Sequence, residues 1–258
     1  MGGSWIIRVE DLDPPREVEG SAERILATLA AFGMTSDRPV MWQSTRGDRY
    51  LAALARLVDA GNAFACSCSR KQLESTGGRH RSPCIAPVDP RQHAWRLQVS
   101  EGEVGFDDLL YGRYVQNLSE DVGDVVLKRS DGPWAYQLAV VVDDAEQGIS
   151  EVVRGADLLD STPRQILLQR RLGLPTPGYL HLPLVLDADG RKLGKSLASL
   201  PVDAADPLPA LHAALHFLGQ DAQRDGGSVS TILRRAERAF TLASIPQPVP
   251  SRMVEASD

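Results

Sequence analysis

Short apolar segments alternate with longer amphipathic segments along this chain, and that alternation limits its possible folds more than any other feature. The apolar segments are typical of buried strands and lie at residues 5–9, 125–127, 138–142, 151–153 and 182–186. Amphipathic helices are predicted at residues 21–33, 48–61, 162–173, 208–218 and 229–240. Buried strands that alternate with helices indicate a parallel sheet covered by helices on both faces. The sequence therefore predicts an α/β fold.

The helix that starts at Thr162 has the clearest predicted boundaries. Thr162 suits the N-cap position, Pro163 suits the first helical position, and Gln165 would complete a capping box. Gly173 ends the apolar pattern and is typical of a helix C-terminus. By the same reasoning Asp48 is predicted to cap the helix that runs to residue 61.

Residues 63–121 interrupt the alternation. They carry all three cysteines and little helical periodicity, and they include short strand-like pieces such as residues 94–99. We therefore interpret this segment as an insertion. The predicted parts of the chain are a first half of the sheet domain, the insertion, a second half, and a basic loop with a helical segment and tail, at residues 1–62, 63–121, 122–190 and 191–258.

The cysteines of the insertion follow a pattern that metal sites use. The order is Cys66, Cys68, then His80, then Cys84. Two thiolates one residue apart can bind the same ion, and the other two residues would complete a tetrahedral set of the kind that holds structural zinc. The alternative is three reduced, partly buried cysteines beside a surface histidine. Three cysteines do not indicate a disulfide framework, and Cys-x-Cys is not the thioredoxin-type redox motif.

Polar residues flank several predicted strands, and ligands of parallel sheets bind at strand ends. Glu10 could hold the ammonium group of a ligand, or it could be a solvated carboxylate. Arg154 could clamp a carboxylate with its planar guanidinium, or it could form an ordinary ion pair. Tyr136 could contact a ligand or only pack, and Asp143 and Asp144 follow the same apolar segment.

A compact basic loop follows the last predicted strand. Lys192, Lys195 and Ser196 lie in it, and such a loop either stabilises the charge of a transferring phosphate or is solvated surface. The sequence contains neither the P-loop pattern nor the dinucleotide-binding GxGxxG pattern, so both of those nucleotide sites lose their main support.

Composition excludes several classes of protein. With 43% hydrophobic and 24% charged residues, the chain resembles neither a disordered nor a collagen-like sequence. No apolar run approaches the roughly 18–20 residues of a membrane span, and the net charge of −6 argues against non-specific coating of nucleic acid. We expect a cytoplasmic protein without membrane contact. His181, His212 and His216 show no partner pattern and are expected to be structural.

Six segments occur in an order that matches one known family. They are RVEDLDPPREV, FACSCSR, AYQLAVVVDD, EVVRGADLL, HLPLVL and RKLGKS. Together they resemble the catalytic core of the class I glutamyl-tRNA synthetases from about Ser4 to Phe240. The short stretch after RKLGKS leaves no room for an anticodon-binding domain, so the resemblance is greatest to the short paralogues of that family.

The resemblance implies a split Rossmann-like parallel sheet with a zinc-bearing insertion and a short C-terminal helical part. It implies activation of L-glutamate with ATP and Mg²⁺, followed by glutamyl transfer to queuosine in the anticodon of tRNA(Asp), by a protein we expect to be a monomer. By matching positions, the residues expected to recognise glutamate are Glu10, Tyr136 and Arg154. Those expected at ATP, in a KMSKS-type loop with Lys195 as its catalytic residue, are Lys192, Lys195 and Ser196. The implied zinc ligands are Cys66, Cys68, His80 and Cys84.

The start of the sequence departs from the family. Family members carry a loop of the form RFAPSPSG and a HIGH-type motif before RVED, whereas this sequence begins MGGSWIIRVED and its first histidine is His80. We favour a start codon placed too late in the gene. The alternative is a catalytically inactive, zinc-stabilised paralogue that binds tRNA or glutamate. A fragment of an ordinary glutamyl-tRNA synthetase would continue as a helical domain after Asp258, and the proline-rich ending speaks against it.

Overall fold

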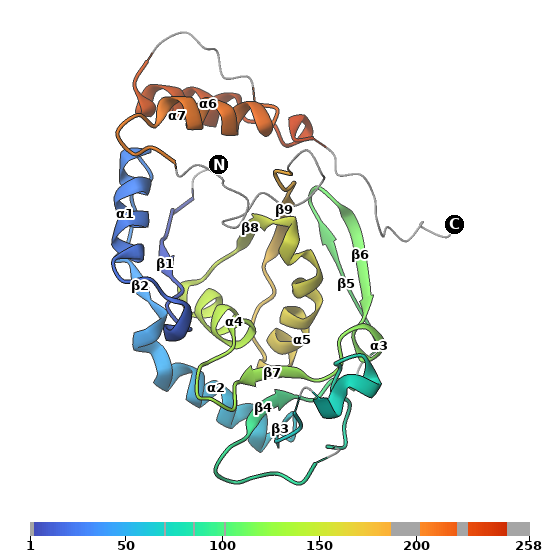
Figure 1. The fold of residues 1–258 in the computed structure, drawn as a ribbon. Coiled ribbons are helices and arrows are strands. Elements are labelled where there is room, and N and C mark those ends of the chain that lie inside the picture. Colours follow the sequence, from blue (N-terminus) through green and yellow to red (C-terminus); the bar gives the residue numbers. More distant parts are fainter. Residues whose placement is uncertain are drawn as a thin grey trace, which may run out of the picture. The chain divides into compact units, whose positions relative to one another are not determined.

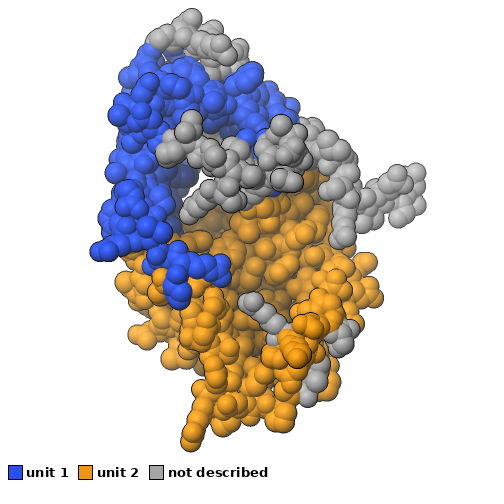
Figure 2. Space-filling model, viewed as in Figure 1, with its two compact units in different colours: residues 1–9, 15–41, 182–249 blue, residues 10–14, 42–181, 250–258 orange. Residues whose placement is uncertain are grey.

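Helices and strands of this chain belong to two units, which Figure 2 colours separately. The computed structural model describes residues 3–69, 71–84, 86–100, 102–186, 202–220 and 227–246. Unit 1 contains residues 1–9, 15–41 and 182–249, and unit 2 contains residues 10–14, 42–181 and 250–258. The predicted α/β fold is confirmed, because helices accompany a sheet that contains a parallel strand pair.

The larger sheet has four strands in the order β6-β5-β9-β8 (Figure 1). Its members are β5 (Glu103–Asp108), β6 (Gly112–Asn117), β8 (Glu151–Gly155) and β9 (Gly178–Leu182). β5 and β6 form an antiparallel hairpin, and β5 runs parallel to β9 with Asp108 opposite Tyr179. The hairpin comes from the segment that the sequence marks as an insertion, so that segment supplies two strands to the sheet.

A smaller antiparallel sheet has the strand order β3-β4-β7. It consists of β3 (Ala63–Cys66), β4 (Ala94–Leu97) and β7 (Val125–Lys128). Cys66 lies opposite Ala94 at one end of this sheet. The first cysteine of the predicted metal-ligand set therefore lies at the end of strand β3.

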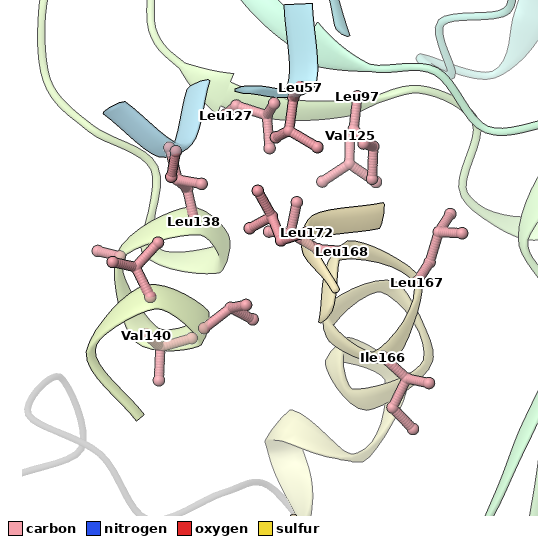
Figure 3. Packing of buried hydrophobic residues seen from close by; sticks show 14 of the residues in the cluster. Leu57, Leu97, Val125, Leu127, Leu138, Val140, Ile166, Leu167, Leu168 and Leu172 are labelled. Carbon is pink, nitrogen blue, oxygen red and sulfur yellow. The ribbon is translucent and has the colours of Figure 1, made fainter. Parts of the chain in front are cut away.

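Buried leucines connect the helices of unit 2 with the smaller sheet. The helices are α2 (Gly47–Asp59), α4 (Tyr136–Gln147) and α5 (Thr162–Leu172). Figure 3 shows their side chains facing those of the strands, and its labelled leucines with an exposure of at most 1% are Leu57, Leu97, Leu127, Leu138, Leu167 and Leu168. Removal of this apolar surface from water is the main force that holds these elements together.

The predicted strand at residues 138–142 is wrong, because this segment lies within helix α4. Its residues from Leu138 to Asp143 are all buried, so the helix is apolar on nearly every side and lacks the amphipathic period of a surface helix. A short apolar run of this kind cannot be assigned to a strand or a helix from periodicity alone. Gly148 ends α4 in a left-handed conformation with a φ of 68°.

Asp143 is consequently a buried helix residue and not a strand-end residue. Its carboxylate accepts hydrogen bonds from Gln43 Nε2 and Tyr50 Oη at 2.7 Å each and from Arg46 Nε at 2.6 Å. These donors precede or belong to α2, so the buried carboxylate fastens α2 to α4. Burial and the hydrogen bond to this carboxylate raise the pKa of Tyr50.

The predicted capping box at the start of α5 is also wrong. Thr162 is the first helical residue, Ser161 occupies the N-cap position, and no side chain caps the helix. Gln165 Nε2 instead donates to Gln137 Oε1 at 2.8 Å, which links α5 to α4. The Thr162 hydroxyl contacts Arg154 on β8 and His181 on β9, so tertiary contacts use both side chains that local capping would need. The predicted end is confirmed, because Gly173 is left-handed with a φ of 64°.

Three further boundaries differ from the sequence prediction. The first strand, β1 (Arg8–Val9), is shorter than residues 5–9 and pairs with β2 (Met41–Trp42). β9 ends at Leu182, where the predicted strand at 182–186 begins. α2 begins at Gly47, so Asp48 lies in the first turn and does not cap the helix.

Unit 1 contains three of the predicted helices. They are α1 (Ser21–Ala31), α6 (Leu208–Phe217) and α7 (Val229–Ala239). The remaining helices of the described chain are α3 (Leu118–Asp121) and short 3-10 turns at residues 14–16, 43–46, 71–76, 156–161 and 242–244. Within the described ranges, none of the helices is long and apolar enough to span a membrane.

Two leucines of α2 test where the core lies. Leu57 is 0% exposed and Leu51 is 55% exposed, although both occupy the same helix. We expect Leu57→Ala to lower the free energy of unfolding by about 2–5 kcal/mol, because it leaves a cavity in the core. Leu51→Ala is the matched control and should change it by no more than about 0.5 kcal/mol. Urea titration measures both, and equal effects would contradict the packing described above.

Candidate functional site

Arg154 lies on β8, and its guanidinium contacts residues of three other elements, β9, α5 and α4. Its Nε donates to His181 Nε2 at 3.0 Å, and its Nη2 donates to Thr162 Oγ1 at 2.7 Å. Its Nη1 lies 3.5 Å from Tyr136 Oη. The guanidinium carbon also lies 5.5 Å from the centre of the Tyr179 ring, within the range of a cation–π contact. The side chain is therefore fixed along one edge.

His181 is a fully buried side chain that the sequence did not mark as part of a site. Its Nδ1 lies 2.7 Å from Asp108 Oδ2, and its backbone N–H donates to the same oxygen at 3.0 Å. The other oxygen of Asp108 accepts the N–H groups of Leu110 and Tyr111. Burial raises the pKa of Asp108, but the hydrogen bonds from His181 and the backbone outweigh it and hold that pKa below its usual range.

Tyr136 is the first residue of α4, and its hydroxyl group faces two charges of opposite sign. Burial raises its pKa, the positive charge of Arg154 lowers it, and the negative charge of Glu10 raises it. Glu10 directly follows β1 and is exposed. The structure thus brings Arg154 and Tyr136 into contact and places Glu10 within electrostatic range of Tyr136.

Residues of the basic loop lie outside the described residues. Lys192, Lys195 and Ser196 all fall in the stretch from 187 to 201. Their expected contacts with ATP stay predictions.

The four residues of the Cys-x-Cys, His and Cys pattern come together in space. One ligand atom from each of Cys66, Cys68, His80 and Cys84 lies within 4.8 Å of the others. Cys66 and His80 are buried, Cys68 and Cys84 are half-buried, and none of the three cysteines forms a disulfide. Together these side chains could hold a metal ion.

The imidazole of His80 gives the strongest indication that the cluster binds a metal ion. Its Nδ1 is bonded to Asp124 Oδ2 at 2.7 Å, whereas its Nε2 is buried and has no hydrogen-bond partner among the described residues. A carboxylate on one imidazole nitrogen and a metal on the other is the usual arrangement of a metal-bound histidine. Asp124 is itself held by Ser82 Oγ at 3.0 Å and by the N–H of Val99 at 2.9 Å.

Without a cation, the thiolate forms of the clustered cysteines are unfavourable. Burial raises the pKa of Cys84 to about 12, and the neighbouring Cys66 and Cys68 add to the increase. Three adjacent thiolates repel one another, and a bound cation removes that penalty. The donor set therefore fits a metal ion that prefers sulfur and imidazole.

Gly123 permits the close approach of the histidine segment to β7. Its φ is +74°, and a Cβ at this position would lie 2.3 Å from the carbonyl oxygen of His80. Any other residue would push His80 away from Asp124, whose N–H donates to that same carbonyl at 2.7 Å. This glycine thus has a steric role that the sequence pattern did not reveal.

Comparison with known proteins gives a consistent result. A family model described as "tRNA synthetases class I (E and Q), catalytic domain" matches residues 1–93 and 87–209. The Glutamyl-Q tRNA(Asp) synthetase of Xanthomonas oryzae pv. oryzae is 58% identical over 249 residues, which cover 95% of this chain and 83% of that protein. The protein of the same name from Burkholderia cenocepacia is 54% identical over 237 residues, which cover 87% of this chain and 80% of that protein.

A solved structure shows the same fold. The glutamate tRNA ligase of Elizabethkingia meningosepticum, solved in complex with its amino acid, superposes with a TM-score of 0.75 at 23% identity. The match covers 95% of this chain but 60% of that one, so this chain spans less than two thirds of the solved protein.

Proposed function

Because this chain belongs to the family of class I tRNA synthetases for glutamate and glutamine, we propose that it activates L-glutamate with ATP and transfers the glutamyl group to queuosine of tRNA(Asp). The observation that carries this proposal is the 58% identity with a Glutamyl-Q tRNA(Asp) synthetase over 95% of the chain. The inactive binding protein considered from the sequence is not favoured, because the relatives that match over most of the chain are named as synthetases.

The proposed reaction has two steps. An oxygen of the glutamate α-carboxylate bonds to the α-phosphorus of ATP, and the bond to pyrophosphate breaks. A nucleophilic oxygen of the queuosine nucleoside then bonds to the activated carbonyl carbon, and AMP leaves with the electron pair. The family implies that Mg²⁺ accompanies ATP. Most of the rate enhancement in such a reaction comes from positioning and from cations placed where phosphate charge develops.

Arg154, Tyr136 and Glu10 are the proposed glutamate ligands. Arg154 Nη1 contacts Tyr136 only at 3.5 Å, so this nitrogen and the phenol hydroxyl can both turn to a carboxylate. Glu10 carries the charge that the substrate ammonium requires. Two groups of opposite charge, both within electrostatic range of Tyr136, suit an amino acid with a charged side chain.

The proposed ATP contacts come from the basic loop. Lys192, Lys195 and Ser196 supply two cations and a hydroxyl within five residues of sequence. A lysine aimed at the phosphates acts mainly in the transition state, where negative charge on the leaving pyrophosphate increases. For this reason Lys195 is proposed as the catalytic residue.

Zinc is the proposed occupant of the Cys66, Cys68, His80 and Cys84 cluster. Three thiolates and one imidazole form a closed tetrahedral set, which is typical of structural zinc and leaves no position for substrate. Its role would be to hold the segment between β3 and β4 in place, because metal binding contributes folding free energy where local structure is sparse.

We expect about one zinc per chain in protein purified without chelators, the content of a single four-ligand site. Asp124→Ala should weaken zinc affinity by about 10- to 100-fold, because His80 loses the carboxylate that orients its ring. Asp121→Ala, an exposed aspartate three residues away, is the control and should leave the affinity unchanged. Competition with a chromophoric chelator measures these affinities. Metal-free protein with a protected 63–97 segment in hydrogen exchange would overturn the assignment.

Substrate choice should depend on Arg154 and Glu10. Glutamate-dependent exchange of pyrophosphate into ATP, without tRNA, should be strongly selective against glutamine and aspartate. Glutamine leaves the half-buried guanidinium of Arg154 without a carboxylate partner. Arg154→Ala should reduce the exchange rate at least about 30-fold, the effect of about 2 kcal/mol, or relax the selectivity.

Controls for this experiment come from the same chain. Arg113→Ala removes an exposed arginine and should behave as the wild type, whereas Glu10→Gln should weaken glutamate use. Both the chain as given and a form lengthened by upstream codons are measured. Wild-type rates and selectivity in Arg154→Ala and Glu10→Gln would show that these residues do not form the glutamate site.

Lys195→Ala should lower the maximal exchange rate by about 10²- to 10³-fold and change glutamate affinity little, because the lost cation acts on the transition state. Lys71→Ala removes an exposed lysine elsewhere and serves as the control. Rates come from the exchange assay and affinities from calorimetry. Unchanged turnover with weaker glutamate binding would contradict the role given to Lys195.

A further inference from the structure

We propose that His181, held by Asp108, is the positioning residue that orients Arg154 toward the carboxylate of the amino-acid substrate. The inference rests on the proposed function only for the identity of that substrate. Its physical basis is a chain of short contacts through three strands, which runs from Asp108 on β5 through His181 on β9 to Arg154 on β8.

The first link sets the tautomer of the imidazole. Asp108 Oδ2 accepts from both the backbone N–H and the ring Nδ1 of His181, at 3.0 and 2.7 Å. A carboxylate only accepts hydrogen bonds, so the Nδ1 that faces it carries the proton. The ionised form of Asp108 is favoured because four donors surround it, two of them backbone N–H groups of its own hairpin turn.

The second link is the hydrogen bond between the imidazole of His181 and the guanidinium of Arg154. With its proton on Nδ1, the neutral ring presents a lone pair at Nε2, and Arg154 Nε lies 3.0 Å away with a proton to donate. The opposite tautomer would place two N–H groups against each other. The carboxylate of Asp108 thus determines that Nε2 can accept from the guanidinium, although it does not touch Arg154 itself.

The third link is geometric. A guanidinium is planar, so contacts at Nε to His181 and at Nη2 to Thr162 fix the plane and the direction of the remaining edge. That edge carries Nη1, which faces the hydroxyl of Tyr136. The Tyr179 ring completes the support, because it lies near the guanidinium and is nearly parallel to the imidazole, at 16°.

Burial makes these contacts more consequential. The side chains of His181 and Asp108 are both 0% exposed, so water cannot replace either partner. A buried donor without an acceptor is costly, and the guanidinium would turn to find another one. Rotation would take Nη1 away from Tyr136 and hence from the proposed substrate position.

Two substitutions of His181 separate positioning from mere packing. In His181→Gln the amide oxygen can reach the place of Nε2 and accept from Arg154, whereas in His181→Asn the shorter amide can satisfy Asp108 but not Arg154. We expect His181→Asn to weaken glutamate binding by about 10- to 100-fold, the effect of one hydrogen bond to a charged group. His181→Gln should recover most of that loss, and ATP affinity should stay constant in both.

Calorimetric titration of the full chain with glutamate and with ATP gives these affinities, and His93→Asn is the matched control at a histidine outside the site. Equal glutamate affinity in the wild type and in His181→Asn would overturn this inference and leave the proposed function intact. Equal losses of glutamate and ATP affinity in the Asn and Gln variants would also overturn it, because that result indicates a general packing role. No glutamate binding by the wild type would overturn the proposed function and this inference with it.

A second measurement determines the tautomer of His181 in the wild-type protein and uses a variant only to assign the signal. Nitrogen-15 NMR of histidine-labelled wild-type protein distinguishes protonated from unprotonated ring nitrogens. We expect the ring signals that disappear in His181→Gln, and so belong to His181, to show a protonated Nδ1 and an unprotonated Nε2. His80, whose Nδ1 faces Asp124, is a second buried histidine whose signals remain in that variant. A protonated Nε2 would overturn the inference, since that nitrogen could not accept from Arg154.

Discussion

The parallel pairing of β5 with β9 is the contact on which the proposed amino-acid site depends. β5 comes from the segment that interrupts the α/β pattern, and its pairing brings Asp108 next to His181. Asp108 accepts two hydrogen bonds at each oxygen, so its buried charge is fully matched. Charged groups persist inside a protein only under such conditions. The segment read as an insertion is therefore part of the wall that supports Arg154, and not only an attachment to the sheet.

The cluster of three cysteines and His80 depends on a second, antiparallel set of strand pairings. β3, β4 and β7 form an antiparallel sheet, and Asp124 directly precedes β7. Its carboxylate holds the imidazole of His80, while the next residues, Val125 and Leu127, enter the hydrophobic core. A displacement of His80 would consequently disturb the packing of the core through Asp124, and repacking of the core would in turn displace Asp124.

Both sites use a carboxylate behind a histidine to control a more distant contact. Asp124 lies behind His80 and its unpaired Nε2, and Asp108 lies behind His181 and its contact to Arg154. The chain as a whole carries a net charge of −6, yet its proposed substrates glutamate and ATP are anions. Anion binding must then come from a few cations held in fixed positions and not from the general field of the protein. Arg154 is one such cation, because His181 and Thr162 hold its guanidinium.

The sequence by itself determined the α/β class, five helices close to their observed positions, and the four cysteine and histidine residues that cluster in space, because each of these leaves a regular spacing within a short window. It did not determine that residues 138–142 are helical, since a segment buried on all sides has no period to read. Nor could it pair His181 with Asp108, which lies 73 residues away, or give Gly123 its steric role. Those features arise from the register between strands and from the packing of helices. Only the tertiary structure decides them, because they bring together atoms whose separation along the chain carries no information about their distance in space.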